Sequence, residues 1–292
     1  MNKRTAGKYV SMATFLLPAF ALIVIFSYYP ALSGILHSFT NWDIGGNADF
    51  IGITNYVEMW KDAVFVKSML NALRYAVFHV VVNVSVPVLV ALLIFHLRTP
   101  RSRYLYRVLF LIPAIIPGIV TYLIWGFIYA PYDGILNTLL ELLRLGDHTR
   151  AWLGDPETAL YAIFFIGFPF VSAFNMLIIY AGLTGIGTSV FDAAEIDGAG
   201  VVARLLHIEL PLIRPQIMLV LILSLIGGFS SYDVALILTQ GGPMNATMLP
   251  GLYMYRNAFQ FGKMGYASAM GTLLFVLLFI LAIFSQRYRR QT

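Results

Sequence analysis

Long apolar stretches without charged residues make up most of the chain, and short polar segments separate them. Five stretches lack Asp, Glu, Lys and Arg altogether: residues 9–42, 75–97, 108–132, 158–191 and 264–286. A sixth, residues 215–238, contains Asp233 as its one charged residue. A helix crosses a bilayer with about 20 apolar residues, whereas the strands of membrane barrels are alternating segments of roughly 10 residues. The pattern therefore predicts an all-α integral membrane fold with six transmembrane helices, at about residues 10–36, 72–96, 106–130, 158–182, 215–238 and 264–286.

The composition adds further limits. Only 11% of the 292 residues are charged, whereas about 25% is usual in soluble domains, so a soluble domain is not expected. The chain has no cysteine, which excludes disulfides and thiolate metal sites. The first apolar stretch, 34 residues from 9 to 42, exceeds the roughly 7–15 residues of a signal-peptide core, and we expect a retained span. Prolines predict kinks in the spans: Pro18, Pro30, Pro87, Pro113, Pro117 and Pro169.

The distribution of charge predicts the orientation of the chain. The termini and the segments at about 97–107 and 183–214 hold 12 Lys and Arg against four Asp and Glu, whereas the other loops hold seven basic and nine acidic residues. The positive-inside rule therefore places both termini in the cytoplasm. Because the basic residues lie at helix ends, no nucleic-acid partner is expected. The outer stretches 51–69 and 135–145 are amphipathic, and they fit either helices resting on membrane lipid or a docking surface for an outside partner.

The loop between the fourth and fifth predicted spans has the pattern of a short helix. Ser189 and Asp192 have the spacing of a capping box, and Gly198 or Gly200 can end the helix. The helix would be rich in alanine and glycine, so a groove on another protein could approach its backbone closely. A solvated connector with ordinary caps is the alternative.

Motifs in this loop and elsewhere resemble those of a known family. The sequence Asp192-Ala-Ala-x-x-Asp-Gly-Ala199, followed by Ile208-x-Leu-Pro211, resembles the EAA loop in the membrane subunits of binding-protein-dependent ABC importers. Further matches resemble the carbohydrate-uptake permeases similar to the larger maltose or lactose permease subunit: Leu16-Leu-Pro18, Ser38-Phe-Thr-Asn-Trp42, Gly52-x-x-Asn-Tyr56, Thr239-x-Gly-Gly-Pro243 and Gly265-Tyr-Ala-Ser-Ala269. Asp192 stands where the family usually has Glu, and Gly187 where it usually has Pro.

The resemblance implies a type I ABC importer permease bundle in the cytoplasmic membrane of a bacterium or archaeon. It divides the chain into an N-terminal span with its outer loop (1–71), a transmembrane core (72–286) with a coupling loop at 184–213, and a basic tail (287–292). The implied partners are a second homologous permease, two ATP-binding subunits and an extracytoplasmic sugar-binding protein. The loop would form a coupling helix against an ATP-binding subunit, with contacts from Asp192, Ala193, Ala194, Asp197, Gly198 and Ala199.

The chain itself lacks the motifs for energy conversion and metal catalysis. Gly262-Lys263 is followed by Met264, so no phosphate-binding loop of the ATPase type is present, and no H-E-x-x-H motif occurs. We therefore expect a transport subunit with no cofactor of its own and no enzymatic activity, with ATP and magnesium bound by the partner ATPase.

Two spans offer candidates for the substrate pathway. The fifth predicted span combines hydroxyl groups, small residues and one carboxylate, which suits a solute rich in hydroxyls: Ser224, Gly227, Gly228, Ser231, Tyr232 and Asp233. In the fourth span, Ala173, Asn175 and Met176 correspond to positions near the ligand in the maltose-type permeases, although Asn175 could also join two helices. Asp233 could recognise a hydroxyl or pair structurally with another helix or subunit.

Three other functions remain as alternatives. The first is an importer of a polyol or of glycerol phosphate. Binding of the phosphate would require an Arg inside the bundle, whereas the sequence places its Lys and Arg near the span ends. An integral-membrane enzyme would need several ionisable groups at one depth, and only Asp233 is predicted to lie deep. A passive channel would have no use for an ordered inner loop. A sugar importer is therefore the main hypothesis.

Overall fold

A computed structural model describes residues 14–290, with side chains through residue 283. In this range the chain is helical, and its extended structure is limited to an isolated antiparallel bridge between Thr40 and Phe50. The basic residues Lys3, Arg4 and Lys8 and the last two residues of the predicted tail lie outside the described residues. The all-helical prediction is confirmed.

Four helices in the described range are long and apolar enough to cross a membrane. They are Thr14–His37, which contains a π-helical turn η1 (Val24–Tyr28) and α2 (Tyr29–His37); α4 (Ala63–Phe95); Arg214–Leu238, which comprises α13 (Arg214–Ser230) and α14 (Asp233–Leu238); and α16 (Met264–Arg290). Two bent pairs would bring the total to six. They are α5 (Pro100–Leu111) and η2 (Ile112–Ile115) with α6 (Gly118–Ile128), bent by 84°, and α9 (Ala173–Thr184) with α10 (Thr188–Ile196), bent by 65°.

Prolines break some of the predicted spans and leave others continuous. The predicted span at 106–130 turns sharply at Pro113 and Pro117, between α5 and α6. The predicted span at 158–182 is interrupted as well, because a non-helical linker at 165–172, which contains Pro169, separates α8 (Ala159–Phe164) from α9. By contrast, α4 continues through Pro87. The interruptions at Pro113, Pro117 and Pro169 agree with the predicted kinks, whereas Pro87 does not interrupt α4.

The chain divides into two compact units, residues 1–63 with 254–276 and residues 64–253 with 277–292. The predicted functional division at residue 71 remains a prediction. In the first unit, α3 (Thr54–Lys61) is fixed by Asn55, whose side-chain amide donates 2.9 Å hydrogen bonds to the carbonyls of Ser38 and Thr40. The backbone N–H of Gly265 donates to the Trp42 carbonyl at 2.8 Å. Two motifs far apart in the sequence therefore meet here.

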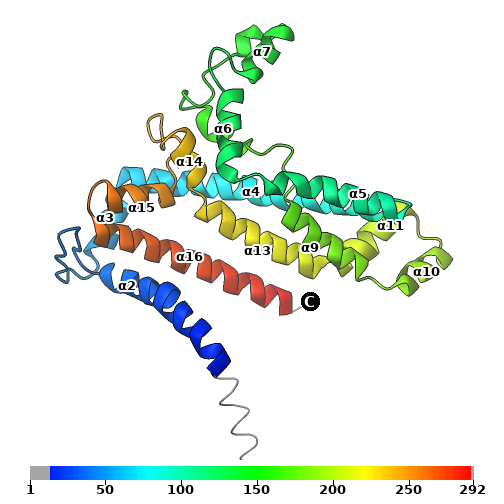
Figure 1. Ribbon diagram of the computed structural model, residues 1–292, viewed down its shortest axis with the longest axis horizontal. Coiled ribbons are helices and arrows are strands. Elements are labelled where there is room, and N and C mark those ends of the chain that lie inside the picture. The colour runs from blue at the N-terminus through cyan, green and yellow to red at the C-terminus, as the bar shows by residue number, and fades with distance from the viewer. Residues whose placement is uncertain (1–13, 291–292) are drawn as a thin grey trace, which may run out of the picture. The chain divides into compact units, whose positions relative to one another are not determined.

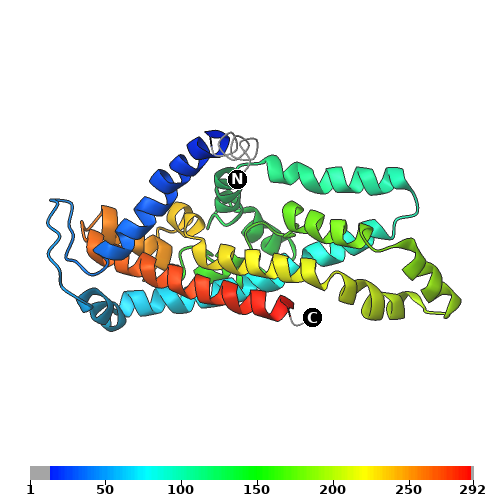
Figure 2. The ribbon, with the colours of Figure 1, turned by 90° about the horizontal axis from the view of Figure 1, so that it is seen from below.

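The core of the second unit lies between α4, α9 and α13, and Figures 1 and 2 both show α9 and α13 side by side. Its buried apolar side chains come from all three helices and the turn before α13: Val90, Ala91, Leu92 and Ile94; Met176, Ile179, Tyr180 and Leu183; Ile213 and Val220. Near the C-terminal end of α13, a Cβ atom on Gly228 would lie 2.8 Å from the Cα of Ala76. The backbones of α4 and α13 therefore touch at this point.

Two further groups of helices complete the second unit. α6 lies against α14 and leads to α7 (Ile135–Leu142) and a 3-10 turn η3 (Gly146–His148), which Figure 1 shows beyond the end of α6. On the other side of the unit, α10 is followed by α11 (Val201–Arg204), the π-helical turn η4 (Leu205–Glu209) and α12 (Leu210–Leu212). α15 (Pro250–Phe259) precedes α16.

Candidate functional site

The predicted loop helix is present as α10, and it begins differently from the prediction. Its N-cap is Gly187, and no side chain caps the helix. The predicted capping box of Ser189 and Asp192 is therefore wrong, because the helix starts one residue before Ser189 and the serine lies inside its first turn. An extended Gly187 does allow the sharp entry that follows α9.

The end of α10 agrees with the sequence prediction. Gly198 has a φ of +69°, its N–H donates to the Glu195 carbonyl at 3.1 Å, and the N–H of Ala199 donates to the Ala194 carbonyl at 2.9 Å. This pair of bonds is a Schellman motif, in which a left-handed residue satisfies the last carbonyls of a helix. The motif fixes the direction in which the chain leaves α10 toward α11.

The six predicted coupling residues do not share one environment. Four of them are exposed in the single chain: Asp192, Ala193, Asp197 and Gly198. Ala199 is half-buried. Ala194, in contrast, is buried and packs inward. Ile196 is 87% exposed, although it is a large apolar residue that the sequence analysis did not select. A partner that covers α10 would therefore meet Ile196 together with the small and acidic residues.

The predicted pathway residues of α9 and α13 mostly face neighbouring helices. The side-chain amide of Asn175 donates to the Asn83 carbonyl at 3.0 Å, and it lies 3.5 Å from Ser224 Oγ. His79 Nδ1 lies 2.9 Å from the Ser224 carbonyl oxygen. Met176 is fully buried in the core, and Ala173 is also buried. In this conformation these residues join α4, α9 and α13.

Asp233 begins α14 just after a break at Ser231 and Tyr232. It was predicted to be deeply buried, but it is exposed in the single chain. Its Oδ2 accepts a 2.7 Å hydrogen bond from the Tyr122 hydroxyl of α6. Nearby, the Ser231 hydroxyl donates to the Gly227 carbonyl at 2.8 Å, and the side chain of Tyr75 of α4 lies close to Ser231 and Asp233. Polar groups from four helices thus gather where α13 ends and α14 begins.

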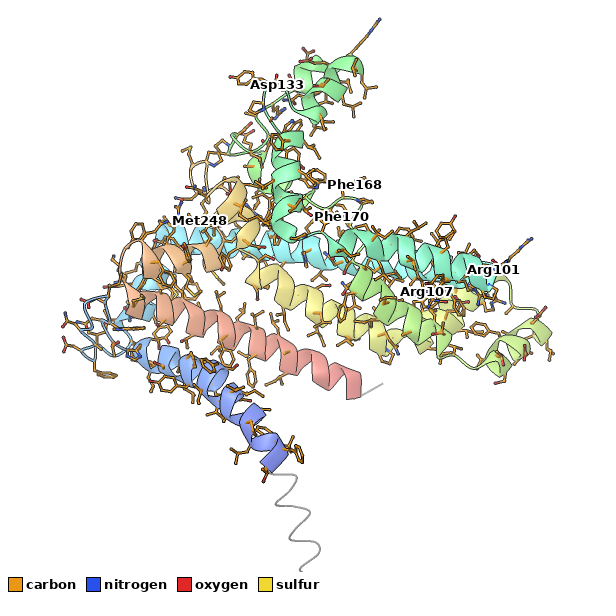
Figure 3. All side chains as sticks on the ribbon, in the orientation of Figure 1. Arg101, Arg107, Asp133, Phe168, Phe170 and Met248 are labelled. Atoms are coloured by element: carbon orange, nitrogen blue, oxygen red, sulfur yellow. The ribbon has the colours of Figure 1, made fainter. Side chains whose placement is uncertain are left out.

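Beside this cluster lies a cavity of about 300 Å³ that the sequence analysis did not identify. Its walls combine aromatic rings with hydrogen-bonding side chains: Tyr75, Phe78, His79, Asn83, Thr121, Tyr122, Phe164, Phe170 and Ser172. The rings of Phe78 and Phe164 are stacked 5.1 Å apart, and Phe170, which Figure 3 labels in the linker before α9, packs edge-on against Phe78. The cavity therefore offers both flat apolar faces and polar atoms.

None of the nine predicted pathway residues lines this cavity, although several touch residues that do. Asn175 contacts Asn83, Ser224 contacts His79, and Asp233 contacts Tyr122. One signal in the sequence could have identified the lining. Tyr75, His79 and Asn83 recur every four residues in an otherwise apolar span, and that spacing places them on one face of a helix.

Residues 83–291 match the family of inner membrane components of binding-protein-dependent transport systems. The chain belongs to this family. Members of the family are similar to the chain over most of its length. A probable ABC transporter permease protein, YurN of Bacillus subtilis, is 30% identical over 275 residues, which cover 94% of each chain. The multiple sugar-binding transport system permease protein MsmF of Streptococcus mutans is 30% identical over 271 residues, which cover 92% of each.

Solved structures support the fold of this family. A bacterial ABC transporter involved in the import of the acidic polysaccharide alginate contains a chain that is 20% identical, with a TM-score of 0.86 over 99% of this chain and 98% of that one. This likeness confirms the predicted fold, and the family match confirms the role as a transport subunit. Within the described residues, no cluster of three or more His, Asp or Glu side chains is arranged to hold a metal ion.

Proposed function

We propose that this chain is one permease subunit of an ATP-driven sugar importer and forms half of the translocation pathway. The cavity carries this proposal. A sugar presents hydroxyl groups and weakly apolar ring faces, so its site needs aromatic surfaces and hydrogen-bonding groups together. Phe78, Phe164 and Phe170 supply the surfaces, and His79, Asn83 and Tyr122 supply polar groups. The relatives named for multiple sugars and for diacetylchitobiose are consistent with this substrate class.

The lining of the cavity favours a neutral sugar over the alternatives. A glycerol phosphate would call for a Lys or Arg, and among the described residues that line the cavity there is neither. Asp233 lies next to the cavity through Tyr122, and a carboxylate accepts hydrogen bonds from sugar hydroxyls. We therefore assign Tyr122 and Asp233 to substrate recognition, with Ser231 and Tyr232 beside them. We assign a supporting role to the residues that lie between the helices and outside the cavity lining: Ala173, Asn175, Met176, Ser224, Gly227 and Gly228.

The proposed assembly contains a second homologous permease, two ATP-binding subunits and an extracytoplasmic sugar-binding protein. The ATP-binding subunits would bind ATP and magnesium and would contact α10. Its exposed face, with Asp192, Ala193, Asp197 and Gly198 around Ile196, has small side chains near the backbone and one apolar anchor. Ala194 and Ala199 would hold the helix in place. We place both termini in the cytoplasm and the apolar side chains of α7 against membrane lipid.

Transport assays on the purified complex test the sugar assignment. The complex is isolated through this chain with the proteins encoded beside it, and the co-purified binding protein is screened with monosaccharides, oligosaccharides, polyols, amino acids and metal ions by thermal shift. Stabilisation by a saccharide, followed by ATP-dependent uptake of that saccharide into proteoliposomes, is the expected result. Stabilisation only by an amino acid or a metal ion would refute the sugar assignment.

Site-directed cross-linking tests the coupling assignment independently. Because the chain has no cysteine, a single Ile196→Cys substitution provides one unique thiol. We expect a photo-activated label on this thiol to capture a nucleotide-hydrolysing protein in intact cells. A label on Tyr132→Cys, at an exposed position on the outer side, is the control and captures no such protein. Failure of the label on Ile196→Cys to capture the ATPase would refute the assignment.

A further inference from the structure

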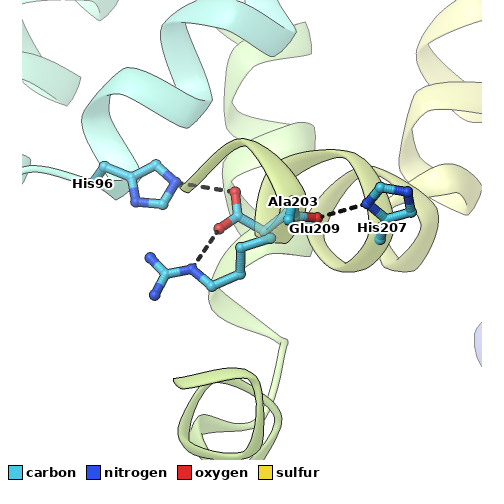
Figure 4. A network of polar contacts seen from close by, with 5 residues as sticks. His96, Ala203, His207 and Glu209 are labelled. Atoms are coloured by element: carbon cyan, nitrogen blue, oxygen red, sulfur yellow. Dashed lines mark hydrogen bonds and ion pairs between the residues drawn. The ribbon is translucent and has the colours of Figure 1, made fainter. Parts of the chain in front are cut away.

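Glu209 is a fully buried carboxylate at the end of the π-helical turn η4, on the segment that returns from α10 to α13. Its Oε2 accepts a hydrogen bond from His96 Nε2 at 3.0 Å, just beyond the end of α4. Its Oε1 lies 3.7 Å from the Nε of Arg204, the last residue of α11. His96 and Arg204 thus lie on opposite oxygens of the same carboxylate, and Figure 4 shows the contact of His96 with Glu209.

This carboxylate is costly to bury and only partly satisfied. Removing a carboxylate from water costs several kcal/mol unless partners replace the lost hydrogen bonds, and a buried ion pair rarely offsets that cost in stability. Here Oε1 of Glu209 and Nε of Arg204 face one another, yet neither has a hydrogen-bond partner. An apolar residue would fill the position at lower cost. The charge therefore fits a role in fixing one arrangement of the segment rather than in overall stability.

The contacts of Glu209 continue to α10 through aromatic rings. The Arg204 guanidinium lies 5.5 Å from the centre of the Phe191 ring of α10. The Phe191 ring lies 5.9 Å from that of Phe95, the last residue of α4 and the neighbour of His96. The five residues thus form a closed circuit, from Phe191 through Arg204, Glu209 and His96 to Phe95 and back to Phe191.

A second pair of contacts fixes the α4 end of this circuit to α5. The Arg103 guanidinium lies 5.9 Å from the centre of the Phe95 ring, and its Nε donates a 2.8 Å hydrogen bond to the Leu97 carbonyl. The C-terminal end of α4, which carries Phe95 and His96, is therefore held in place by Arg103 of α5. π-Helical turns inside helices are rare and are often found at functional sites, and the one at η4 carries Glu209 as its last residue.

We propose that His96, Arg204 and Glu209 are positioning residues that fasten the coupling helix α10 to the cytoplasmic end of transmembrane helix α4. When an ATP-binding subunit moves α10, α4 is then displaced with it, because α10 contacts the end of α4 both through Phe191 and Phe95 and through Arg204, Glu209 and His96. This inference rests on the proposed coupling role of α10. It adds which transmembrane helix receives the movement and through which side chains.

Substitutions at Glu209 test the proposal in the reconstituted complex, with sugar uptake and ATP hydrolysis measured together. Glu209→Leu leaves His96 and Arg204 unpaired, and we expect the sugar transported per ATP hydrolysed to fall about tenfold, as the loss of a charge-assisted hydrogen bond allows. Glu209→Gln keeps the shape of the side chain and one hydrogen bond, so the sugar transported per ATP hydrolysed should fall less in this variant. His96→Gln, which keeps a donor, should transport more per ATP than His96→Leu.

The matched control lies two residues away on the same turn. His207 bonds only to the Ala203 carbonyl of its own helix, at 3.0 Å, and is exposed. His207→Gln should therefore leave the ratio of transport to hydrolysis unchanged. Co-purification of every variant with its partners verifies folding and assembly, so that a change in the ratio reports coupling and not loss of protein.

A cross-link provides a second test that does not depend on removing a charge. In the cysteine-free chain, Phe95→Cys and Phe191→Cys are joined by a short bifunctional thiol reagent. If α10 and the end of α4 move together, the cross-linked complex keeps its uptake; if they move apart during transport, the cross-link blocks uptake and the proposal is overturned. An unchanged ratio in Glu209→Leu would also overturn it. An unmodified complex without ATP-driven uptake would instead refute the proposed function.

Discussion

The hydroxyl of Tyr122 donates a 2.7 Å hydrogen bond to Oδ2 of Asp233, and this bond joins α6 to the first residue of α14. Each of the two helices begins at an interruption of a longer apolar stretch. α6 follows the bend at Pro117, and α14 follows the break at Ser231 and Tyr232. The bond therefore connects two places where the backbone changes direction beside the cavity.

Removing this hydroxyl should impair transport more than it impairs folding. We expect Tyr122→Phe to lower sugar uptake about tenfold, because a hydrogen bond to a charged group contributes roughly 1.5–3 kcal/mol. Tyr129→Phe is the matched control, since Tyr129 lies at the end of the same helix and its hydroxyl donates to the Ala162 carbonyl at 3.0 Å, away from Asp233. Uptake assays on both variants decide; equal uptake would contradict the assignment of Tyr122.

Substitution of Gly198 should separate insertion from coupling. Gly198→Asp places a side chain on a residue with φ of +69° and adds negative charge at the C-terminal end of α10, where the helix dipole disfavours it. We expect the protein to insert and assemble but to lose uptake at a normal level of ATP hydrolysis. Gly200→Ala, with an ordinary φ of −64° and open space around the added Cβ, should transport normally. Normal uptake by Gly198→Asp would contradict the coupling role.

Two adjacent glycines of α13 give a sharp test of helix packing. A Cβ at Gly228 would meet the Cα of Ala76 at 2.8 Å, whereas a Cβ at Gly227 would lie 3.4 Å from His79 Cε1. Gly228→Ala should therefore destabilise the protein by about 1–3 kcal/mol, the usual cost of overpacking. Gly227→Ala should change the stability much less. Thermal unfolding of the detergent-solubilised protein measures both, and an equal loss of stability would show that α4 and α13 are not in backbone contact.

Asn71 of α4 should hold the segment that follows α14. Its side-chain amide lies within 3.3 Å of the carbonyls of Asn245, Ala246 and Met248, and the last of these residues is labelled in Figure 3. Asn71→Leu would leave these carbonyls without this donor, at a cost of about 1–3 kcal/mol. We expect faster proteolysis and amide exchange at residues 240–248.

Lys67 supplies the control for this prediction. It donates a 2.9 Å hydrogen bond to the Met244 carbonyl of the same segment, but the contact is exposed to solvent. Lys67→Met should therefore leave the exchange rates nearly unchanged. Slow exchange at residues 240–248 in Asn71→Leu would show that other contacts hold the segment.

The sequence predicted the helical class and the positions of the apolar spans because uncharged length alone decides whether a helix can cross a bilayer. It also predicted kinks at Pro113, Pro117 and Pro169, where the spans are interrupted, but it did not distinguish these prolines from Pro87. Pro87 is accommodated inside α4, whereas Pro117 follows a sharp bend. A proline in a membrane helix is tolerated when neighbouring groups satisfy the freed backbone, and those neighbours come from distant parts of the sequence.

The candidate site was predicted less completely than the fold. Gly198 was one of the two glycines expected to end α10, because a left-handed position after a helix favours glycine, and its φ of +69° agrees with that expectation. The cavity was not identified, since its lining comes from α4, α6, α8, α14 and the linker before α9, which only the folded chain brings together. Glu209 was counted as one of several cytoplasmic acids, and nothing in its local sequence indicates that it is fully buried.

The continuity of α4 links the two halves of this site. The helix carries Phe95 at its C-terminal end and Tyr75 at the cavity, and 20 residues of helix correspond to about 30 Å. Because α4 is one continuous helix, a displacement of its C-terminal end at Phe95 would also move Tyr75 at the cavity. In the proposed importer, this one helix would span the distance between the ATP-binding subunit and the solute, and no series of rearranging side chains would be needed between them.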